Sequence, residues 1–494
     1  MGIRPFYYAL NEDILVFGSE LRYVLASFKT QPALQKEYFL DTLVSVKSSK
    51  AITPYENIYR LKPGYFLHYL NGLSTDQLYW KADPDKKIRL SEEEEYVELF
   101  REKLVGAVNM RCSGDSLLGS ELSGGLDSSA VTGIAAEFAS DMNIQLVAFS
   151  NLFPSDSDIE FKDEKEFINC MQKFKPFYWS GIEQLDNSIL ELLRYTVDIQ
   201  GGFVQQNFNI FNRGIFKVAG EKGIKILLSG FGGDEMVSAR IAFPWNEIIG
   251  EQKWSVLMDE LFYKGITIKK MLKTGFIFYQ YLQSLLNHPK YKTGIFTPEL
   301  LNKRFANLPL NPSFAQQYSL RKRHGEKNKL PWHENISASQ YDRIMLEHLP
   351  QRMEYCYTAA AQYGVEYRYP LLDIDLIETY LAFPPWMKQY HGINRYVFRE
   401  AIKGFVPEEI RQRDDKSGTT IPHLHYSLLK EKDQIMRFIR SCAGQPDLEK
   451  IMDLSKFPQW YEKLTQRDKA DINFLNPGAF YAYLMIMLYF RDHG

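Results

Sequence analysis

Residues 123–129 form a glycine-rich string, Ser-Gly-Gly-Leu-Asp-Ser-Ser, between an apolar run and a helical pattern. Two adjacent glycines allow a tight turn whose backbone N–H groups can approach phosphate oxygens. Ser128 and Ser129 open the helix, whose N-terminus provides further N–H donors for the same anion. Asp127 adds the hard carboxylate ligand that Mg²⁺ requires beside a phosphate chain. The string therefore predicts a loop that binds pyrophosphate together with magnesium.

A second string, Leu-Leu-Ser-Gly-Phe-Gly-Gly-Asp-Glu at residues 227–235, also follows an apolar strand. Ligands of open α/β sheets bind at the carboxyl ends of the strands, so both strings should meet at one edge of the sheet. Asp234 would then be the second carboxylate on the magnesium ion. A Walker loop requires the spacing GxxxxGK[ST], which does not occur here, so an ordinary kinase or P-loop ATPase is disfavoured.

The elements that must position these strings alternate between β-like and helical patterns. We expect strands over residues 116–122, 144–149 and 224–228, and helices over residues 128–138 and 161–174. Alternation of this kind predicts an α/β fold in which helices cover both faces of a parallel sheet.

Two domains are expected in a chain of 494 residues. Short β-like runs between Tyr7 and Tyr69 indicate a small β-rich domain over residues 1–90. Residues 91–494 form the larger domain, and its part from Gln340 onward is expected to be mostly helical. We interpret residues 239–335 as an irregular, locally basic insertion, in which the basic run Arg-Lys-Arg near its end belongs to a solvated loop.

The composition excludes several classes of protein. Hydrophobic residues make up 45% and charged residues 24%, as in soluble globular proteins, and the net charge of −2 gives no general attraction to nucleic acid or anionic membranes. Four cysteines without paired spacing disfavour a disulfide framework or a zinc site and favour a reducing cytoplasm. The apolar stretch 480–490 is too short to span a bilayer. We therefore predict a cytoplasmic protein with neither nucleic acid nor a membrane as partner.

The first string resembles the loop of the PP-loop ATP pyrophosphatases, which split ATP into AMP and pyrophosphate. Over nearly its whole length, the chain resembles the asparagine synthetase family of that superfamily. The resemblance implies an adenine nucleotide α-hydrolase-like fold, ATP and Mg²⁺ as cofactors, and an N-terminal remnant of an Ntn-type glutaminase domain. The matching motifs lie at residues 2–8, 17–21, 61–64, 366–373, 392–399 and 407–410, followed by Lys416 and Gly418.

The N-terminal domain departs from the family pattern. The family's glutaminase requires an N-terminal cysteine nucleophile, but residue 2 is glycine and the front half of the glutaminase fold is missing. Either the domain is a relic or the start codon was assigned too late. We therefore expect that the chain as given does not hydrolyse glutamine by the family's mechanism.

Further departures resemble lasso-peptide cyclases, which close a peptide into an isopeptide ring. Asparagine synthetases usually carry an acidic residue where this chain has Phe231, and the long insertion after Glu235 is unusual for them. Glu121 and Leu122 before the loop, with the string Arg-Asp-Asp-Lys at residues 413–416, also look more like the cyclases.

The resemblance suggests roles for individual residues. Glu354 matches, counted back from Asp373, the glutamate base of β-lactam synthetases and could deprotonate an attacking amine. Lys416 would neutralise charge on the phosphates during adenylation. A solvated helix residue and a surface lysine are the alternative interpretations of these two positions. Asp127 and Asp234 would hold Mg²⁺. ATP or pyrophosphate would contact Leu122, Ser123, Gly124, Gly125, Leu126, Asp127, Ser128, Ser129, Ser150, Ser229 and Gly230.

These observations predict an ATP-dependent, AMP-forming amide ligase that activates a side-chain carboxylate as an acyl-adenylate and joins it to an amine. Macrolactam closure of a lasso peptide is the preferred reaction, and a leader-binding protein and a leader peptidase are the partners it implies. One alternative is an asparagine synthase that uses glutamine or ammonia with aspartate. Two others are an inactive ATP-binding scaffold and a PP-loop enzyme that acts on tRNA, which the charge and the unpaired cysteines disfavour.

Overall fold

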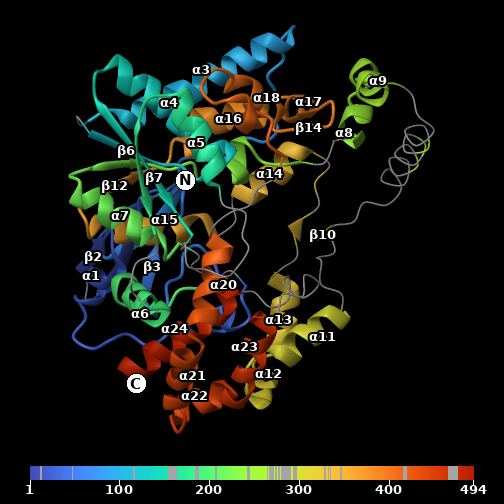
Figure 1. The fold of residues 1–494 in the computed structure, drawn as a ribbon. Helices are drawn as coiled ribbons and strands as arrows, with labels where there is room; N and C mark the ends of the chain where they lie inside the picture. The colour runs from blue at the N-terminus through green and yellow to red at the C-terminus, as the bar shows by residue number, and fades with distance from the viewer. Residues whose placement is uncertain are drawn as a thin grey trace.

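The structure is a computed structural model of the chain, drawn as a ribbon in Figure 1. It describes residues 1–494 apart from residues 12–13, 47, 115–116, 154–163, 184–187, 206–208, 242–244, 264, 266–271, 273–274, 276–278, 280–290, 293–297, 328–329, 332, 334, 345–347, 415–419, 466–476 and 494.

Five parallel strands form the central sheet, in the order β12-β9-β6-β7-β8. The chain fills this sheet outward from β6, with β7 and β8 on one side and β9 and β12 on the other. The order therefore reverses between β6 and β9, and the crevice at their carboxyl ends is a topological switch point. The strands are β6 (Leu117–Glu121), β7 (Gln145–Asn151), β8 (Tyr178–Ile182), β9 (Ile226–Leu228) and β12 (Glu366–Arg368).

Helices cover both faces of the sheet, as predicted (Figure 1). One face carries α3 (Glu93–Cys112) and α4 (Leu126–Asp141), and the other carries α7 (Asn212–Glu221) and α15 (His348–Ala361). Because both faces are covered, β9 is a short apolar strand in which every residue is buried. The α/β class and the three predicted strands are confirmed. The strand β12 was not predicted, because the chain after residue 340 reads as helical.

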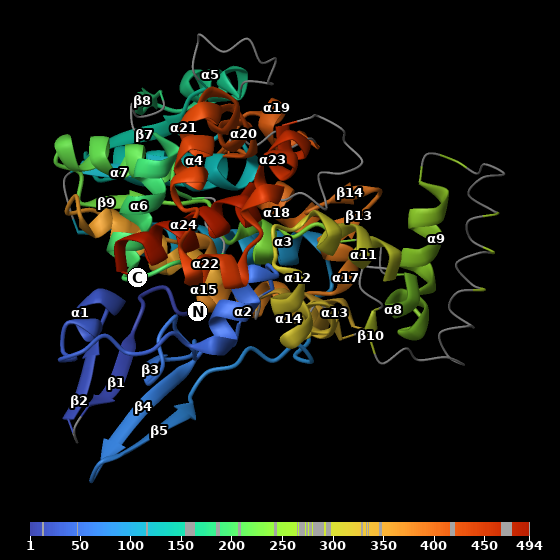
Figure 2. The same cartoon turned by 90° about the horizontal axis from the view of Figure 1, so that it is seen from below.

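The N-terminal segment forms a separate antiparallel sheet in the order β2-β1-β3, followed by the hairpin β4-β5 (Figure 2). Tyr7, Ala9 and Ile58 are buried on the inner face of the sheet. The strands are β1 (Tyr7–Asn11), β2 (Ile14–Gly18), β3 (Ile58–Arg60), β4 (Tyr65–Leu70) and β5 (Leu73–Leu78), with helices α1 (Leu21–Leu25) and α2 (Lys36–Leu43).

The basic run Arg321–Lys322–Arg323 lies in helix α13 (Leu320–Lys327), so the prediction of a solvated loop was wrong. Arg323 and Lys327 place their charged groups 2.6 Å from the buried carboxylate of Asp41 in α2. These ion pairs fix the helix against the N-terminal segment, a distant contact that the local basic pattern does not reveal. Other helices of this region are α8 (Trp245–Gly250), α9 (Trp254–Phe262), α11 (Pro298–Asn307) and α12 (Pro312–Gln317).

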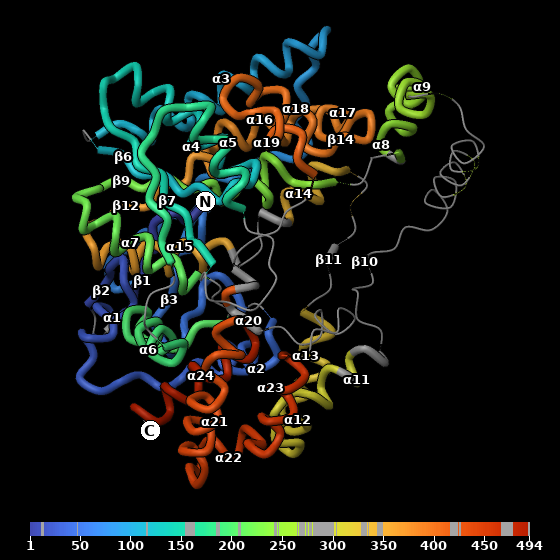
Figure 3. The backbone as a smooth tube through the Cα atoms, viewed as in Figure 1, coloured from blue at the N-terminus to red at the C-terminus, as the bar shows by residue number. Residues whose placement is uncertain are grey.

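The C-terminal helix α24 (Pro477–His493) packs beside α2, so segments from the two ends of the chain lie side by side (Figure 3). The hydroxyl of Tyr483 donates a hydrogen bond to the Leu43 carbonyl oxygen at 2.8 Å. Residues 480–488, which belong to the apolar stretch noted in the sequence, are buried. Within the part of the chain that the structure describes, no helix has the length and apolar character needed to cross a bilayer.

Candidate active site

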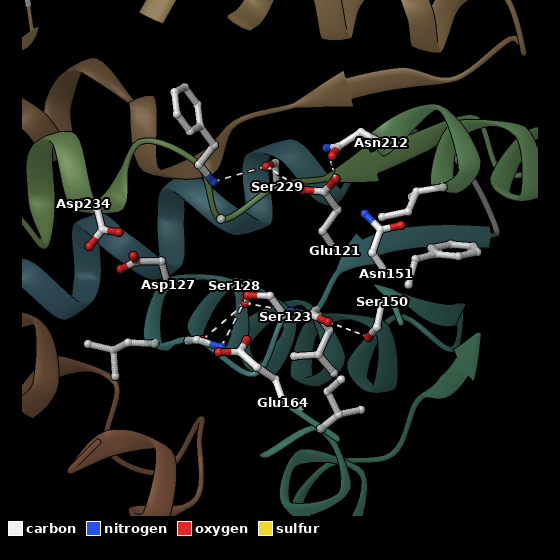
Figure 4. Close-up of a pocket in the computed structure, with 18 of the residues that line it drawn as sticks. Glu121, Ser123, Asp127, Ser128, Ser150, Asn151, Glu164, Asn212, Ser229 and Asp234 are labelled. Carbon is white, nitrogen blue, oxygen red and sulfur yellow. Dashed lines mark hydrogen bonds between the residues drawn. The ribbon is translucent and has the colours of Figure 1, made fainter. Parts of the chain in front are cut away.

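A cavity of about 280 Å³ lies at the carboxyl ends of β6, β7 and β9 (Figure 4). The loops after β6 and β9 carry the two glycine-rich strings, so the switch point of the sheet brings them together. The lining residues that the sequence predicted are Leu122, Ser123, Gly125, Leu126, Asp127, Ser128, Ser150, Ser229, Gly230 and Asp234.

The first loop turns sharply at Gly124, whose φ of +73° is in the left-handed region that favours glycine. The Ser123 N–H donates to Ser128 Oγ at 3.1 Å, and the two serine hydroxyls lie 3.0 Å apart. These bonds close the loop over the start of α4. The first N–H groups of α4 are at this end of the helix, beside the cavity. Gly124 and Ser129 are not among the lining residues, and Ser129 is fully buried.

Arg395 joins the two carboxylates that were predicted to hold magnesium. Its Nη2 is paired with Asp234 Oδ1, and its Nη1 lies 3.6 Å from Asp127 Oδ2. Ser238 Oγ donates to Asp127 Oδ1 at 2.5 Å, which fixes the direction of that carboxylate. Because both carboxylates contact one buried cation, they lie around a common position. This arrangement suits two ligands of one divalent ion beside a phosphate chain. Arg395 was not predicted as a site residue.

The two loops pack against each other at glycines. A Cβ at Gly233 would lie 2.4 Å from Asp127 Cγ, and a Cβ at Gly230 would lie 2.5 Å from the Ser128 backbone nitrogen. Because a side chain at either position would collide, the contact between the loops requires glycine at both. The positions of the glycines in the second string thus match the close approach of the first loop.

Arg413 and Glu164 support the first loop and also line the cavity. Arg413 Nη1 donates to the Gly124 carbonyl oxygen at 3.0 Å, and Nη2 donates to Glu164 Oε1 at 2.9 Å. The guanidinium group also lies 3.9 Å from the ring centre of Phe167. Both charged side chains are buried, at 8% exposure for Arg413 and 3% for Glu164. Neither was predicted, because 289 residues separate Arg413 from Gly124.

Ser150, at the end of β7, is tied to the first loop by hydrogen bonds. Its hydroxyl donates to the Leu122 carbonyl oxygen at 2.5 Å and accepts from Trp179 Nε1 at 3.0 Å. The side chain is therefore already engaged and buried, so its contribution to nucleotide binding would be to shape the edge of the cavity.

Glu121, the last residue of β6, lines the cavity on the β9 side. Its Oε1 accepts from Asn212 Nδ2 at 2.9 Å, and its Oε2 accepts from Ser229 Oγ at 3.0 Å (Figure 4). The Tyr367 hydroxyl in turn donates to Ser229 Oγ at 2.9 Å. Burial raises the pKa of the Glu121 carboxyl group, and the nearby Arg352 opposes this rise. Glu121 is thus an acidic group in the cavity wall to which sequence reasoning had given no chemical role.

Comparison with known proteins is consistent with this geometry. Residues 99–475 match the family model described as asparagine synthase, and residues 1–80 match the glutamine amidotransferase domain. The chain belongs to the asparagine synthase family. Members of this family are ATP-dependent ligases, and the family uses ATP.

Individual relatives in this family are distant. The chain is 24% identical to asparagine synthetase [glutamine-hydrolyzing] 1 of Bacillus subtilis, with 95% of this chain and 71% of that protein covered. It is also 24% identical to amidase chyE of Penicillium rubens, with 91% and 72% covered. Asparagine synthetase 3 of B. subtilis is 27% identical, with 94% and 70% covered. The names of these relatives differ in activity, so they leave the substrate open within the family.

Glu354 does not line the cavity. Its carboxylate lies 2.7 Å from Arg60 Nε of the N-terminal segment, and the pair is buried. Burial raises the pKa of the Glu354 carboxyl group, while Arg60 and Tyr7 oppose the rise. The structure therefore places this residue in a contact between the two segments, away from the two glycine-rich loops. Lys416, the other predicted catalytic residue, lies outside the described residues.

Phe231 lies in the second loop, between Gly230 and Gly232. The Arg352 guanidinium carbon lies 4.0 Å from the centre of its ring, and the ring also packs against Tyr369. Both Phe231 and Arg352 line the cavity. The wall beside the second loop is therefore aromatic and cationic, and Phe231 itself can accept no proton.

Proposed function

We propose that this protein catalyses AMP-forming amide synthesis at the cavity between the two glycine-rich loops. The observation that carries the proposal is the convergence of Asp127 and Asp234 on one cation beside a loop of backbone N–H donors. A pyrophosphate group needs hydrogen-bond donors and positive charge, which the loop backbone and Arg395 would supply beside the two carboxylates that could hold magnesium. The family match adds that relatives of this chain are ATP-dependent ligases.

The proposed reaction has two steps. First, a substrate carboxylate attacks the α-phosphorus of ATP, the bond to the β-phosphate oxygen breaks, and pyrophosphate leaves. Backbone N–H groups of the first loop and of the start of α4 hold the leaving pyrophosphate, and Arg395 balances its charge. Magnesium, when bound between Asp127 and Asp234, would neutralise further charge on the phosphate chain. Second, an amine attacks the acyl-adenylate and releases AMP.

The substrate that we propose is a peptide whose own N-terminal amine attacks an activated Asp or Glu side chain, as in lasso-peptide cyclases. Phe231 and Arg352 favour this choice, because an aromatic wall suits an apolar peptide better than a free ammonium ion. A cyclase of this kind would work in the cytoplasm with a leader-binding protein and a leader peptidase. Asparagine synthesis from aspartate is the second candidate, favoured by the names of two B. subtilis relatives.

Release of AMP and pyrophosphate from Mg-ATP tests the proposal. The purified chain is incubated with leaderless peptides encoded near its gene or, separately, with aspartate and ammonia. We expect turnover with a peptide, whose mass falls by one water. Asp127→Ala should abolish turnover, whereas the matched variant Asp141→Ala, at the exposed end of the same helix, should retain it. Turnover with aspartate and ammonia alone would replace the peptide substrate by asparagine synthesis, and no turnover with either would favour the ATP-binding scaffold.

A further inference from the structure

The second step of the proposed reaction requires a group that takes a proton from the amine. An amine that has attacked an acyl carbon carries a proton that must leave before the amide is stable. Phe231 has no acidic or basic group, and Glu354 is paired with Arg60 outside the cavity. Among the described lining residues, the acidic side chains are Glu121, Asp127, Glu164, Asp234 and Glu235.

Most of these carboxylates are committed to other groups. Asp127 and Asp234 share Arg395 at the predicted metal position. Glu164 is paired with Arg413 and supports the phosphate loop. Glu235 lies beside Asp234 in the turn that follows the second loop, within the short π-helix Gly233–Val237. Glu121 differs, because its described hydrogen bonds come from the neutral groups of Asn212 and Ser229.

We propose that Glu121 is the general base of the amide-forming step. Its carboxylate is at the carboxyl end of β6, directly before the phosphate loop, and its partner Ser229 begins the second loop. An acyl-adenylate whose one remaining phosphate is held by these loops would have its reacting carbonyl next to this pair of residues. This inference rests on the proposed function, and it adds the residue that accepts the proton.

The proton transfer balances without any additional reactant. The nitrogen lone pair forms the new bond to the acyl carbon, and the bond between that carbon and the AMP phosphate oxygen breaks. AMP leaves with the electron pair of that bond, and the nitrogen proton passes to a Glu121 carboxylate oxygen. Ser229 and Tyr367 extend the hydrogen-bond chain from this carboxylate into the protein.

The surroundings of Glu121 suit a base. Arg352 and Cys356 from α15 and Tyr367 from β12 are the charged or titratable groups that face it. Burial raises the pKa of the Glu121 carboxyl group above its ordinary value, which makes the carboxylate a stronger proton acceptor. Asn212 and Ser229 hold both oxygens in place, so the orientation does not depend on substrate.

The test separates the two chemical steps in the full chain. Substrate-dependent exchange between ATP and labelled pyrophosphate reports adenylation, and mass spectrometry of the product reports amide formation. Hydroxylamine provides a third measurement, because it is largely unprotonated at neutral pH and attacks an acyl-adenylate without a base. The carboxylate substrate is whichever of the leaderless peptide or aspartate supports wild-type turnover. Glu121→Gln is compared with Glu102→Gln, a control at an exposed position of α3.

We expect Glu121→Gln to retain exchange and hydroxamate formation within about threefold, while amide formation falls about 10²- to 10⁴-fold. Glu102→Gln should match the wild type in all three measurements. Amide formation by Glu121→Gln within about threefold of wild type would overturn the inference. An equal loss of all three activities would also overturn it, because Glu121 would then only support the phosphate site through Ser229.

A second variant covers the case in which Glu121→Gln is poorly folded. Glu121→Asp keeps the charge and withdraws the carboxylate by one methylene, so its ratio of amide formation to exchange should fall at least tenfold. An unchanged ratio would contradict the base role. If the wild-type chain shows no exchange with any substrate, the proposed function itself fails. If the wild-type chain shows exchange and the Glu121 variants keep the wild-type rate of amide formation, only the role of Glu121 as base fails.

Discussion

Gly230 shows how one atom constrains the phosphate site. A Cβ added there would lie 2.5 Å from the Ser128 nitrogen, in the backbone that begins α4. No flexible side chain can yield at that contact, so one of the two loops must move. The same argument explains why the second string carries its glycines beside Asp234.

Gly230→Ala is therefore expected to lower AMP release at least about tenfold, because a shift of about 1 Å at a reacting centre can cost far more than a lost contact. The matched control is Gly106→Ala in α3, where an added Cβ would meet no atom within 4 Å. That control should keep its activity and gain roughly 0.5–1 kcal/mol of stability, since alanine is a better helix former. Equal activities for the two variants would show that the loops do not need this close contact.

At the level of single elements, the loop before α4 depends on a side chain from a distant segment. Arg413 holds both the Gly124 carbonyl oxygen and Glu164, so one residue fixes the turn of the phosphate loop. A lysine would keep the charge beside Glu164 but lacks the second donor direction of a guanidinium group.

We expect Arg413→Lys to raise the KM for ATP about tenfold, which corresponds to roughly one lost hydrogen bond, with little change in the amide step. Arg440→Lys, an exposed position on α21 (Lys432–Ser441), should leave the KM unchanged. Steady-state pyrophosphate release at varied ATP concentration measures both. A change in kcat without a change in KM would contradict the proposed support of the loop.

Lys388, the last residue of α17 (Pro385–Lys388), is a buried cation that joins this helix to two others. Its Nζ donates to Ser337 Oγ at 2.8 Å and to Gln340 Oε1 at 2.9 Å in α14 (Ile336–Ile344). It also donates to the Leu381 carbonyl oxygen in α16 (Ile374–Ala382). Burial lowers the pKa of Lys388 to about 7; the charge of Lys87 acts in the same direction, and that of Glu247 opposes it.

The lowered pKa predicts a pH dependence of stability. The unfolded lysine remains protonated up to about pH 10, so folding releases a proton between about pH 7 and pH 10. The free energy of unfolding contributed by this group therefore rises with pH across that window. The free energy of unfolding is measured with urea at pH 7 and pH 9. Relative to Lys388→Met, it should rise with pH in the wild type and in the control Lys86→Met, which changes an exposed residue. A pH-independent difference between wild type and Lys388→Met would refute it.

For the whole molecule, the N-terminal segment is joined to the larger domain by a buried ion pair. Arg60 in β3 and Glu354 in α15 lie 2.7 Å apart, and α15 also carries Arg352 on the cavity wall. The segment that matches a glutamine amidotransferase domain thus contacts the helix that lines the candidate active site.

Removing one partner of a buried pair leaves the other charge without compensation, so Arg60→Met should cost about 3–5 kcal/mol of stability. Arg4→Met is the control, because Arg4 pairs with Glu366 across the same two segments at 71% and 39% exposure, and it should cost less than about 1 kcal/mol. Glu354→Gln should likewise lower the urea midpoint. If Glu354→Gln instead kept its stability and lost only amide formation, Glu354 would be the catalytic base and the assignment to Glu121 would fail.

The sequence alone determined the parts of this protein that depend on short-range order. An apolar strand and a glycine-rich turn are contiguous in each string, so the two loops, the place of Asp127 and the parallel sheet could be predicted from local patterns. Only the tertiary structure decided which distant side chains complete the site. Contacts between residues more than 90 positions apart bring in Arg395, Arg413 and Glu121. The local spacing of residues in the sequence does not reveal such contacts. The position of Glu354 outside the cavity could not be predicted for the same reason, because its partner Arg60 lies in the N-terminal segment.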